Sequence, residues 1–104
     1  MSNNDHMVSL AVIALIRTHA IDNPIKSKAI EEAYGIDGTK VRQFVHEARL
    51  AGHAIGSNNT GYFNCRNADE WRETRDNLHG RAMSILSLLK KVDESFTEKE
   101  SLFG

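Results

Sequence analysis

Residues 36–52 read IDGTKVRQFVHEARLAG, and this segment has the pattern of a short helix with one apolar side. Asp37 is a good N-cap, and Gly52 is a good stop signal. Apolar residues recur between them every three or four positions, at Val41, Phe44, Val45, Ala48 and Ala51. The opposite face carries hydrogen-bond donors and positive charge, at Thr39, Lys40, Arg42, Gln43, His46 and Arg49. We expect one side of this helix to pack on a small core.

A helix with these two faces is suited to the major groove of DNA, because its donors and charges point away from the core. An ordinary surface helix shows the same pattern. The neighbouring segments must therefore decide between the two interpretations.

The residues before this helix predict two further helices. Residues 7–19 have a broad apolar face at helical spacing, and Pro24 disfavours a helix at the residue before it. Ser27 is then expected to cap a short helix over residues 28–34, with Ala29, Ile30 and Ala33 as its buried face. Gly35 supplies the positive φ that ends it. Two short helices joined by a turn with glycine are typical of a helix-turn-helix.

The residues after Gly52 change to an extended pattern. Residues 53–56 and 62–65 are short and extended, and the turn-forming residues 57–61 separate them, which predicts a β-hairpin. The expected fold class is therefore mainly α with a small β-hairpin, a winged helix-turn-helix followed by a long C-terminal helix. We expect a flexible N-terminus at 1–7, the winged domain at 8–65, the long helix at 66–96 and a flexible tail at 97–104.

Residues 8–65 resemble the N-terminal winged-helix domain of biotin-operon-type repressors. The matching features are the short apolar helix with its glycine, the register of Val41 and Val45, Gly52, and a wing that ends in Gly61-Tyr62. The chain is also similar to small winged-helix proteins of phages and prophages. These resemblances imply DNA binding, and they imply no ligase activity because no ligase domain is present.

Composition limits the class of protein. The chain has 104 residues and a net charge of -1, so a nucleic-acid site must be a local patch. Cys65 is the only cysteine, which excludes an internal disulfide and favours a reducing compartment. The longest apolar run, residues 10–16, is far shorter than the roughly 20 residues that a membrane span needs. We expect a cytoplasmic protein with no membrane contact.

The last third of the chain predicts one long helix that begins at Asn67. Apolar residues along it fall at alternating spacings of four and three, typical of a coiled coil: Leu78, Ala82, Ile85, Leu89, Val92 and Phe96, with Trp71 on the same line. From 67 to 94 this helix would measure about 42 Å. A winged domain is too small to cover that surface, so we expect a homodimer through this helix. The alternative is a helix that folds back onto its own N-terminal helix.

The tail ends in Ser101-Leu102-Phe103, which resembles the last three positions of the pentapeptide that binds the bacterial sliding clamp. The first two residues of that motif are missing. Clamp binding and a tail that merely packs or frays both remain open.

No catalytic or metal-binding pattern is present. The five histidines are scattered, and Cys65 has no partner at metal spacing, whereas zinc requires compact groups of ligands. We therefore expect no cofactor, no metal and no enzymatic activity.

The chain is expected to bind double-stranded DNA as a homodimer and to act in transcription control or replication, as a phage-type regulator. Base contacts are predicted for Thr39, Arg42, Gln43 and His46. Phosphate contacts are predicted for Lys26, Ser27, Lys28 and Lys40, with Asn58 and Asn59 at the wing tip. The wing lacks Arg and Lys, and acidic residues surround the site. The alternative is therefore a winged-helix module that binds proteins, either as a host-protein inhibitor or as a replisome or clamp adaptor.

Overall fold

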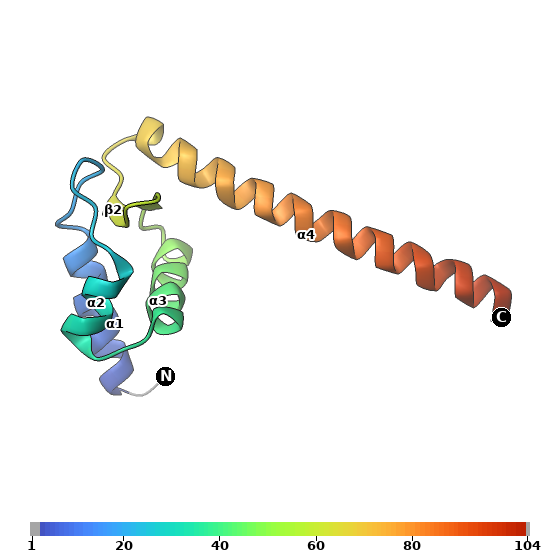
Figure 1. Cartoon of the computed structure of the whole chain (residues 1–104), viewed down its shortest axis with the longest axis horizontal. Helices are drawn as coiled ribbons and strands as arrows, with labels where there is room; N and C mark the ends of the chain where they lie inside the picture. Colours follow the sequence, from blue (N-terminus) through green and yellow to red (C-terminus); the bar gives the residue numbers. More distant parts are fainter. Residues whose placement is uncertain (1–2, 104) are drawn as a thin grey trace. The chain divides into compact units, whose positions relative to one another are not determined.

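Three short helices pack around one apolar core in the computed structural model, and a small hairpin follows them (Figure 1). The structure describes the backbone of residues 3–103 and the side chains of residues 4–97. The elements in chain order are α1 (Asn3–Ile16), α2 (Ser27–Tyr34), α3 (Gly38–Leu50), β1 (Ile55–Ser57), β2 (Tyr62–Asn64) and α4 (Ala68–Phe103). The expected mainly helical chain, with a two-stranded hairpin and a long C-terminal helix, is confirmed, and helix makes up 68% of the residues.

The chain divides into two units, Met1–Thr74 and Arg75–Gly104. The first unit holds α1, α2, α3, the hairpin and the start of α4, whereas the second is the remainder of α4. No described helix combines the length and the apolar character that crossing a membrane would require.

The core of the first unit contains side chains from all three short helices and from the hairpin. The buried apolar residues are Val12, Ile13, Ile16, Ile30, Val41, Phe44, Val45, Ala48, Ile55 and Phe63. The predicted apolar face of α3 is confirmed except for Ala51, which lies beyond the last helical residue and is exposed. The predicted buried face of α2 is partly wrong: Ala29 and Ala33 are exposed, because Ile30, with Tyr34 beside it, makes the contact of this two-turn helix with the core.

Helix α1 starts and ends earlier than the predicted range of 7–19. Its first turn contains Asp5, whose carboxylate suits the positive end of the helix dipole and pairs with Lys40 of α3 at 3.0 Å. The helix ends at Ile16, and the Thr18 hydroxyl just beyond it donates to the Leu15 carbonyl at 2.7 Å. Tertiary pairing therefore extends the helix into the segment for which fraying was expected.

The connection from α2 to α3 has the predicted turn chemistry. Gly35 adopts the left-handed conformation with φ 63° and ends α2. Asp37 caps α3, and its carboxylate accepts a hydrogen bond from the Lys40 backbone N–H at 2.8 Å. Ser27 is the first residue of α2 rather than its cap, because its hydroxyl donates to the Glu31 carboxylate at 2.9 Å instead of accepting from the backbone.

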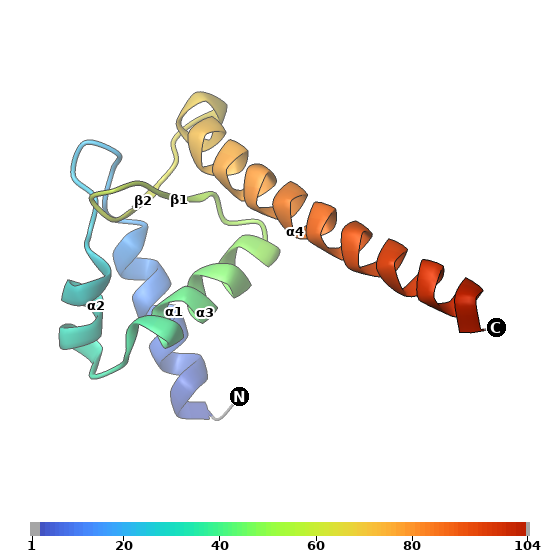
Figure 2. The same ribbon diagram turned by 45° about the vertical axis from the view of Figure 1, so that its right-hand side comes forward.

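The hairpin pairs β1 and β2 in the antiparallel sense (Figure 2). Gly56 lies opposite Phe63 in this register. Residue Ile25, in the loop before α2, adds an isolated antiparallel bridge to Tyr62, with both N–H···O distances at 2.8 Å. Ser57 belongs to β1 and not to the predicted loop, because it pairs with Tyr62 across the hairpin. The Thr74 hydroxyl also bonds both of its backbone groups. The hairpin is thus joined on one side to the start of α2.

Helix α4 is capped by Asn67, whose side chain accepts from the Glu70 N–H at 3.0 Å. It continues to Phe103, beyond the predicted end at 96. Residues 97–103 are mostly polar, but Glu and Lys are good helix formers, and this is why polarity alone misplaced the end. Gly80 lies inside the continuous helix.

Candidate nucleic-acid interface

The outer face of α3 presents the four predicted base readers to solvent. Thr39, Arg42, Gln43 and His46 are all exposed, whereas the opposite face of the same helix is buried. The Arg42 guanidinium donates to the Thr39 hydroxyl at 3.1 Å, and the Gln43 amide donates to the Glu47 carboxylate at 3.4 Å. These are weak surface contacts, so both side chains are accessible to a ligand.

Lys40 is more constrained than its neighbours on α3. Its ammonium pairs with the Asp5 carboxylate at 3.0 Å and lies 5.9 Å from the centre of the Phe44 ring. The Lys40 side chain is 33% exposed. One of the four predicted phosphate-binding residues is therefore engaged in holding α1 against α3.

The start of α2 and the tip of the hairpin form one shallow pocket. Its lining is Lys26, Ser27, Ser57, Asn58, Asn59, Thr60, Gly61 and Tyr62. The two segments lie more than 30 positions apart in the sequence, and the backbone bridge between Ile25 and Tyr62 joins them. The structure thus brings together two of the predicted phosphate ligands and both wing-tip asparagines. Lys28 is exposed on α2 but does not line this pocket.

The two asparagines of the tip differ in their surroundings. The Asn58 side-chain oxygen accepts from the backbone N–H groups of Thr60 and Gly61, at 2.8 and 3.1 Å. It shapes the turn as an Asx motif. Asn59 is exposed and has its amide available at the tip.

Arg49 and Thr74, which lie outside the predicted site, hold the hairpin in place. The sequence did not indicate this role. The Arg49 guanidinium donates to the Ile55 carbonyl at 2.9 Å and to the Ser57 hydroxyl at 3.4 Å. It also lies 5.9 Å from the centre of the Trp71 ring. The contact of Arg49 with Trp71 spans 22 positions, so no local periodicity could have indicated it.

Thr74 completes this support. Its hydroxyl accepts from the Ser57 N–H at 3.0 Å and donates to the Ser57 carbonyl at 3.3 Å, and the residue is buried. The start of α4 is therefore fastened to β1 within the first unit.

No protein-family model, curated protein or solved structure matches this chain. What the chain does must be inferred from its own residues.

The predicted dimerisation residues fall into two groups. Trp71 belongs to the first unit, where its ring packs beside Arg49. The others lie on the second unit: Leu78 is half-buried and Ala82, Ile85, Leu89, Val92 and Phe96 are exposed. Seven of the ten exposed large apolar side chains among residues 4–97 lie between 83 and 96. Apart from Met83 they lie on one side of the helix, and contiguous apolar surfaces of this kind mark interaction sites.

The other predicted features can be placed only in part. The Ser101-Leu102-Phe103 motif has helical backbone, but its side chains lie outside the described residues. Among the side chains of residues 4–97, no three His, Cys, Asp or Glu residues gather as a metal site would require. Burial raises the pKa of the Cys65 thiol, and nearby Glu70 raises it further. The thiol is therefore held in its neutral, less nucleophilic form.

Proposed function

We propose that residues 3–64 are a winged helix-turn-helix and that the chain is a non-enzymatic DNA-binding protein. It works as a homodimer in transcription control or replication. The order of three helices and a hairpin supports this fold, as does the glycine-containing turn between α2 and α3. The bridge at Ile25 adds a third, short strand segment beside the hairpin, which stiffens the wing.

The observation that carries the proposal is the division of α3 into two faces. Val41, Phe44, Val45 and Ala48 fix the helix to the core, and Asp37 caps its first turn. Arg42 and Gln43 project from the opposite side with their donor groups accessible. Arginine suits the acceptors of guanine, and glutamine suits the donor and acceptor pair of adenine.

The pocket between α2 and the wing tip suits the DNA backbone. Lys26 occupies the N-cap position of α2 without a side-chain cap, and its carbonyl accepts from the N–H groups of Ala29 and Ile30. Lys26 and Ser27, at this end of the helix, line the pocket. A helix N-terminus favours a phosphate oxygen. We assign Lys26, Ser27 and Asn59 to phosphate contacts that fix the register of α3.

The number of cations sets how strongly salt should weaken binding. Lys26, Lys28 and Arg42 are exposed, whereas Lys40 is paired with Asp5. Three contacts per subunit make six in a dimer, and six released counterions lower the affinity about a thousandfold between 50 and 200 mM salt. Sequence-independent binding should therefore be detectable only at low salt.

The test is duplex selection followed by affinity measurement on the selected site. The double variant Arg42→Ala with Gln43→Ala should lose site preference, at a cost of about 1–3 kcal/mol for each base contact. The matched control is Lys91→Ala, which removes a positive charge from an exposed position of α4. Circular dichroism should show unchanged helix content in both variants.

Equal affinity of the double variant and the wild type for the selected duplex would place the DNA site elsewhere. Failure to select any sequence, with no duplex binding at low salt, would exclude DNA binding.

A second candidate is a winged-helix module that binds proteins. The net charge of -1 and the engagement of Lys40 with Asp5 favour it, because they weaken the attraction to phosphate. The exposed apolar residues of α4 would then bind a protein partner, such as a sliding clamp or another replisome component. Absence of duplex binding at low salt, together with a stable complex with such a purified partner, distinguishes this function from the first.

A further inference from the structure

The second unit of the chain presents an apolar face along α4. The α4 seam consists of Leu78, Ala82, Ile85, Leu89, Val92 and Phe96. The four large residues from Ile85 to Phe96 are 45% to 57% exposed. Leu86 and Leu88 flank the seam on either side and are 56% and 61% exposed. This apolar face is therefore widest halfway along its length, at the level of Ser87.

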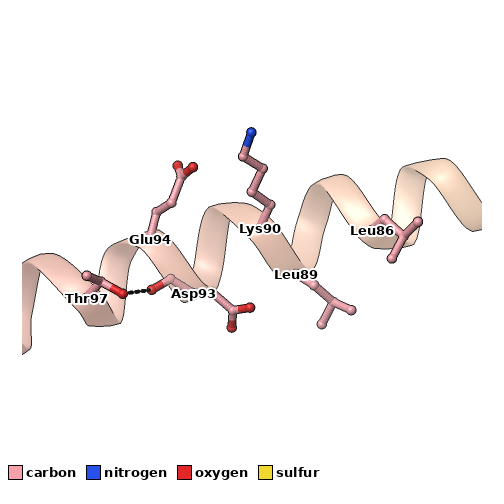
Figure 3. Close-up of a pocket in the computed structure, with 6 residues that line it drawn as sticks. All are labelled: Leu86, Leu89, Lys90, Asp93, Glu94 and Thr97. Atoms are coloured by element: carbon pink, nitrogen blue, oxygen red, sulfur yellow. Dashed lines mark hydrogen bonds between the residues drawn. The ribbon is translucent and has the colours of Figure 1, made fainter.

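The spacing of the seam assigns its residues to the a and d positions of a heptad, with Ala82 and Leu89 at a and Ile85 and Val92 at d. Leu86 then falls at an e position and Leu88 at a g position. Figure 3 agrees with this register: Leu86, Leu89 and Asp93 project from one side of the helix, and Lys90 and Glu94 project from the other.

We infer that this face binds the same face of a second copy, with the two helices antiparallel. The two-fold axis passes between the helices at the level of Ser87, which itself lies on the opposite side of α4. This inference rests on the homodimer of the proposed function. In an antiparallel pair, an a residue meets a d residue of the other helix. The axis at Ser87 sets Ile85 against the partner's Leu89, Ala82 against the partner's Val92, and Leu78 against the partner's Phe96. Every residue of the α4 seam then meets an apolar residue of the partner. Phe96, the largest of them, meets the partner's Leu78 rather than the partner's Phe96.

Leu86 and Leu88, which flank the seam, favour an antiparallel over a parallel pair of helices. In a parallel pair, g and e residues of adjacent heptads face each other, which would set Leu86 against the partner's Arg81 and Leu88 against the partner's Asp93. Both contacts would bury a leucine beside a charge. In the antiparallel pair, each leucine faces its own counterpart across the axis.

The antiparallel arrangement also gives a more favourable polar contact beside the seam. His79 shares the e positions with Leu86, and the antiparallel pairing sets it against the partner's Asp93. In a parallel pair, His79 would instead face the partner's Thr74. The antiparallel direction therefore joins apolar groups to apolar groups at the centre and sets His79 beside a carboxylate on the flank.

The antiparallel direction also sets the separation of the two Arg75 residues along the paired helices. Arg75 is the first residue of the second unit and lies 12 positions before the level of Ser87. At 1.5 Å per residue, Arg75 and the partner's Arg75 are then about 36 Å apart along the helix axis. A parallel pair would bring the two units to the same end.

Disulfide cross-linking tests the direction without using DNA. Two full-length variants, Ile85→Cys and Leu89→Cys, are made in a Cys65→Ser background, and one of them carries a mass tag. We expect the mixture to form the 85–89 heterodimer as its main cross-linked product and each variant alone to link several-fold less. Ser87→Cys, on the opposite side of α4, is the control that should not link.

Self-linked dimers of each variant, with no excess of the heterodimer, would overturn the antiparallel pairing. A monomer in sedimentation at the concentration used for linking would overturn it as well. Because duplex binding is measured separately, loss of DNA binding with the 85–89 product intact would reject the proposed function and leave the helix pairing in place.

Discussion

Thr74 is the buried polar side chain within residues 4–97, and it connects α4 to the edge of the hairpin. It acts together with Arg49, which reaches the same strand from α3. Two single side chains thus help to fix the wing within the first unit, beside the backbone bridge from Ile25. Neither residue belongs to a recognisable motif, because each acts through tertiary contacts with distant backbone groups.

Thr74→Val should lower the free energy of unfolding by about 1–3 kcal/mol, because the Ser57 N–H loses its acceptor inside the protein. The matched control is Thr97→Val, an exposed threonine of the same helix whose hydroxyl donates to the Asp93 carbonyl. Its effect should stay within about 0.5 kcal/mol. Urea unfolding at one protein concentration measures both, and equal effects would contradict the assigned role of Thr74.

Gly61 lies where the wing passes closest to the Ile25 backbone. A Cβ at this position would meet the Ile25 carbonyl, so Gly61→Ala should separate the bridge between Ile25 and Tyr62. We expect a loss of about 1–3 kcal/mol from the overpacked contact. Gly80→Ala is the control: nothing lies within 4 Å of its Cβ, and it should stabilise the helix by about 1 kcal/mol. Thermal unfolding that ranks the two variants in the reverse order would refute this account.

At the scale of elements, the start of α4 is stabilised by a charged pair as well as by its cap. The Glu70 carboxylate accepts from the Arg66 backbone N–H at 2.8 Å and pairs with the Arg66 guanidinium at 2.6 Å. These hydrogen bonds lower the pKa of Glu70 below its ordinary value of 4.5. A carboxylate in the first turn also suits the positive end of the helix.

A lowered pKa gives this contribution a definite dependence on pH. The folded protein binds the Glu70 proton less tightly than the unfolded chain, so the stabilisation is complete above pH 4.5 and is lost as pH falls through the lowered pKa. Glu70→Gln should therefore destabilise the protein at neutral pH and match the wild type in acid. Glu73→Gln, exposed on the next turn, is the control. Unfolding curves on both sides of pH 4.5 test this, and a constant difference would contradict it.

At the scale of the whole molecule, the two units differ in how far their apolar side chains are buried. The first has its own apolar core, whereas the described part of the second exposes most of its large apolar side chains. Each such side chain contributes about 1.5–3 kcal/mol when it passes from full exposure to full burial. Burial of these half-exposed residues on two copies would offset the cost of association, which is several kcal/mol.

Leu89→Asp should prevent the proposed dimer from forming, because it places a charge in the middle of the α4 seam. Ser87→Asp adds the same charge on the opposite side of the helix and should leave the dimer unchanged. Sedimentation equilibrium measures both. A dimer that survives Leu89→Asp would show that the seam is not the interface, and DNA affinity measured alongside would show whether two reading units are required.

Local pattern predicted the helices of the first unit well where a residue acts on its own backbone neighbours. The cap at Asp37, the turn at Gly35 and the buried face of α3 are such cases, and all three are confirmed. The candidate base readers could also be chosen from the sequence, because they lie opposite that buried face. Their binding to DNA stays a prediction.

The sequence alone determined the buried face of α3 and the turn at Gly35, since these depend on residues within one or two turns of each other. The tertiary structure decided the rest: the bridge from Ile25 to Tyr62, the anchoring of Ser57 by Thr74 and the pairing of Lys40 with Asp5. Each of these joins groups that are distant along the chain and of ordinary type. Their partnership follows from how the elements pack, and periodicity carries no information about it.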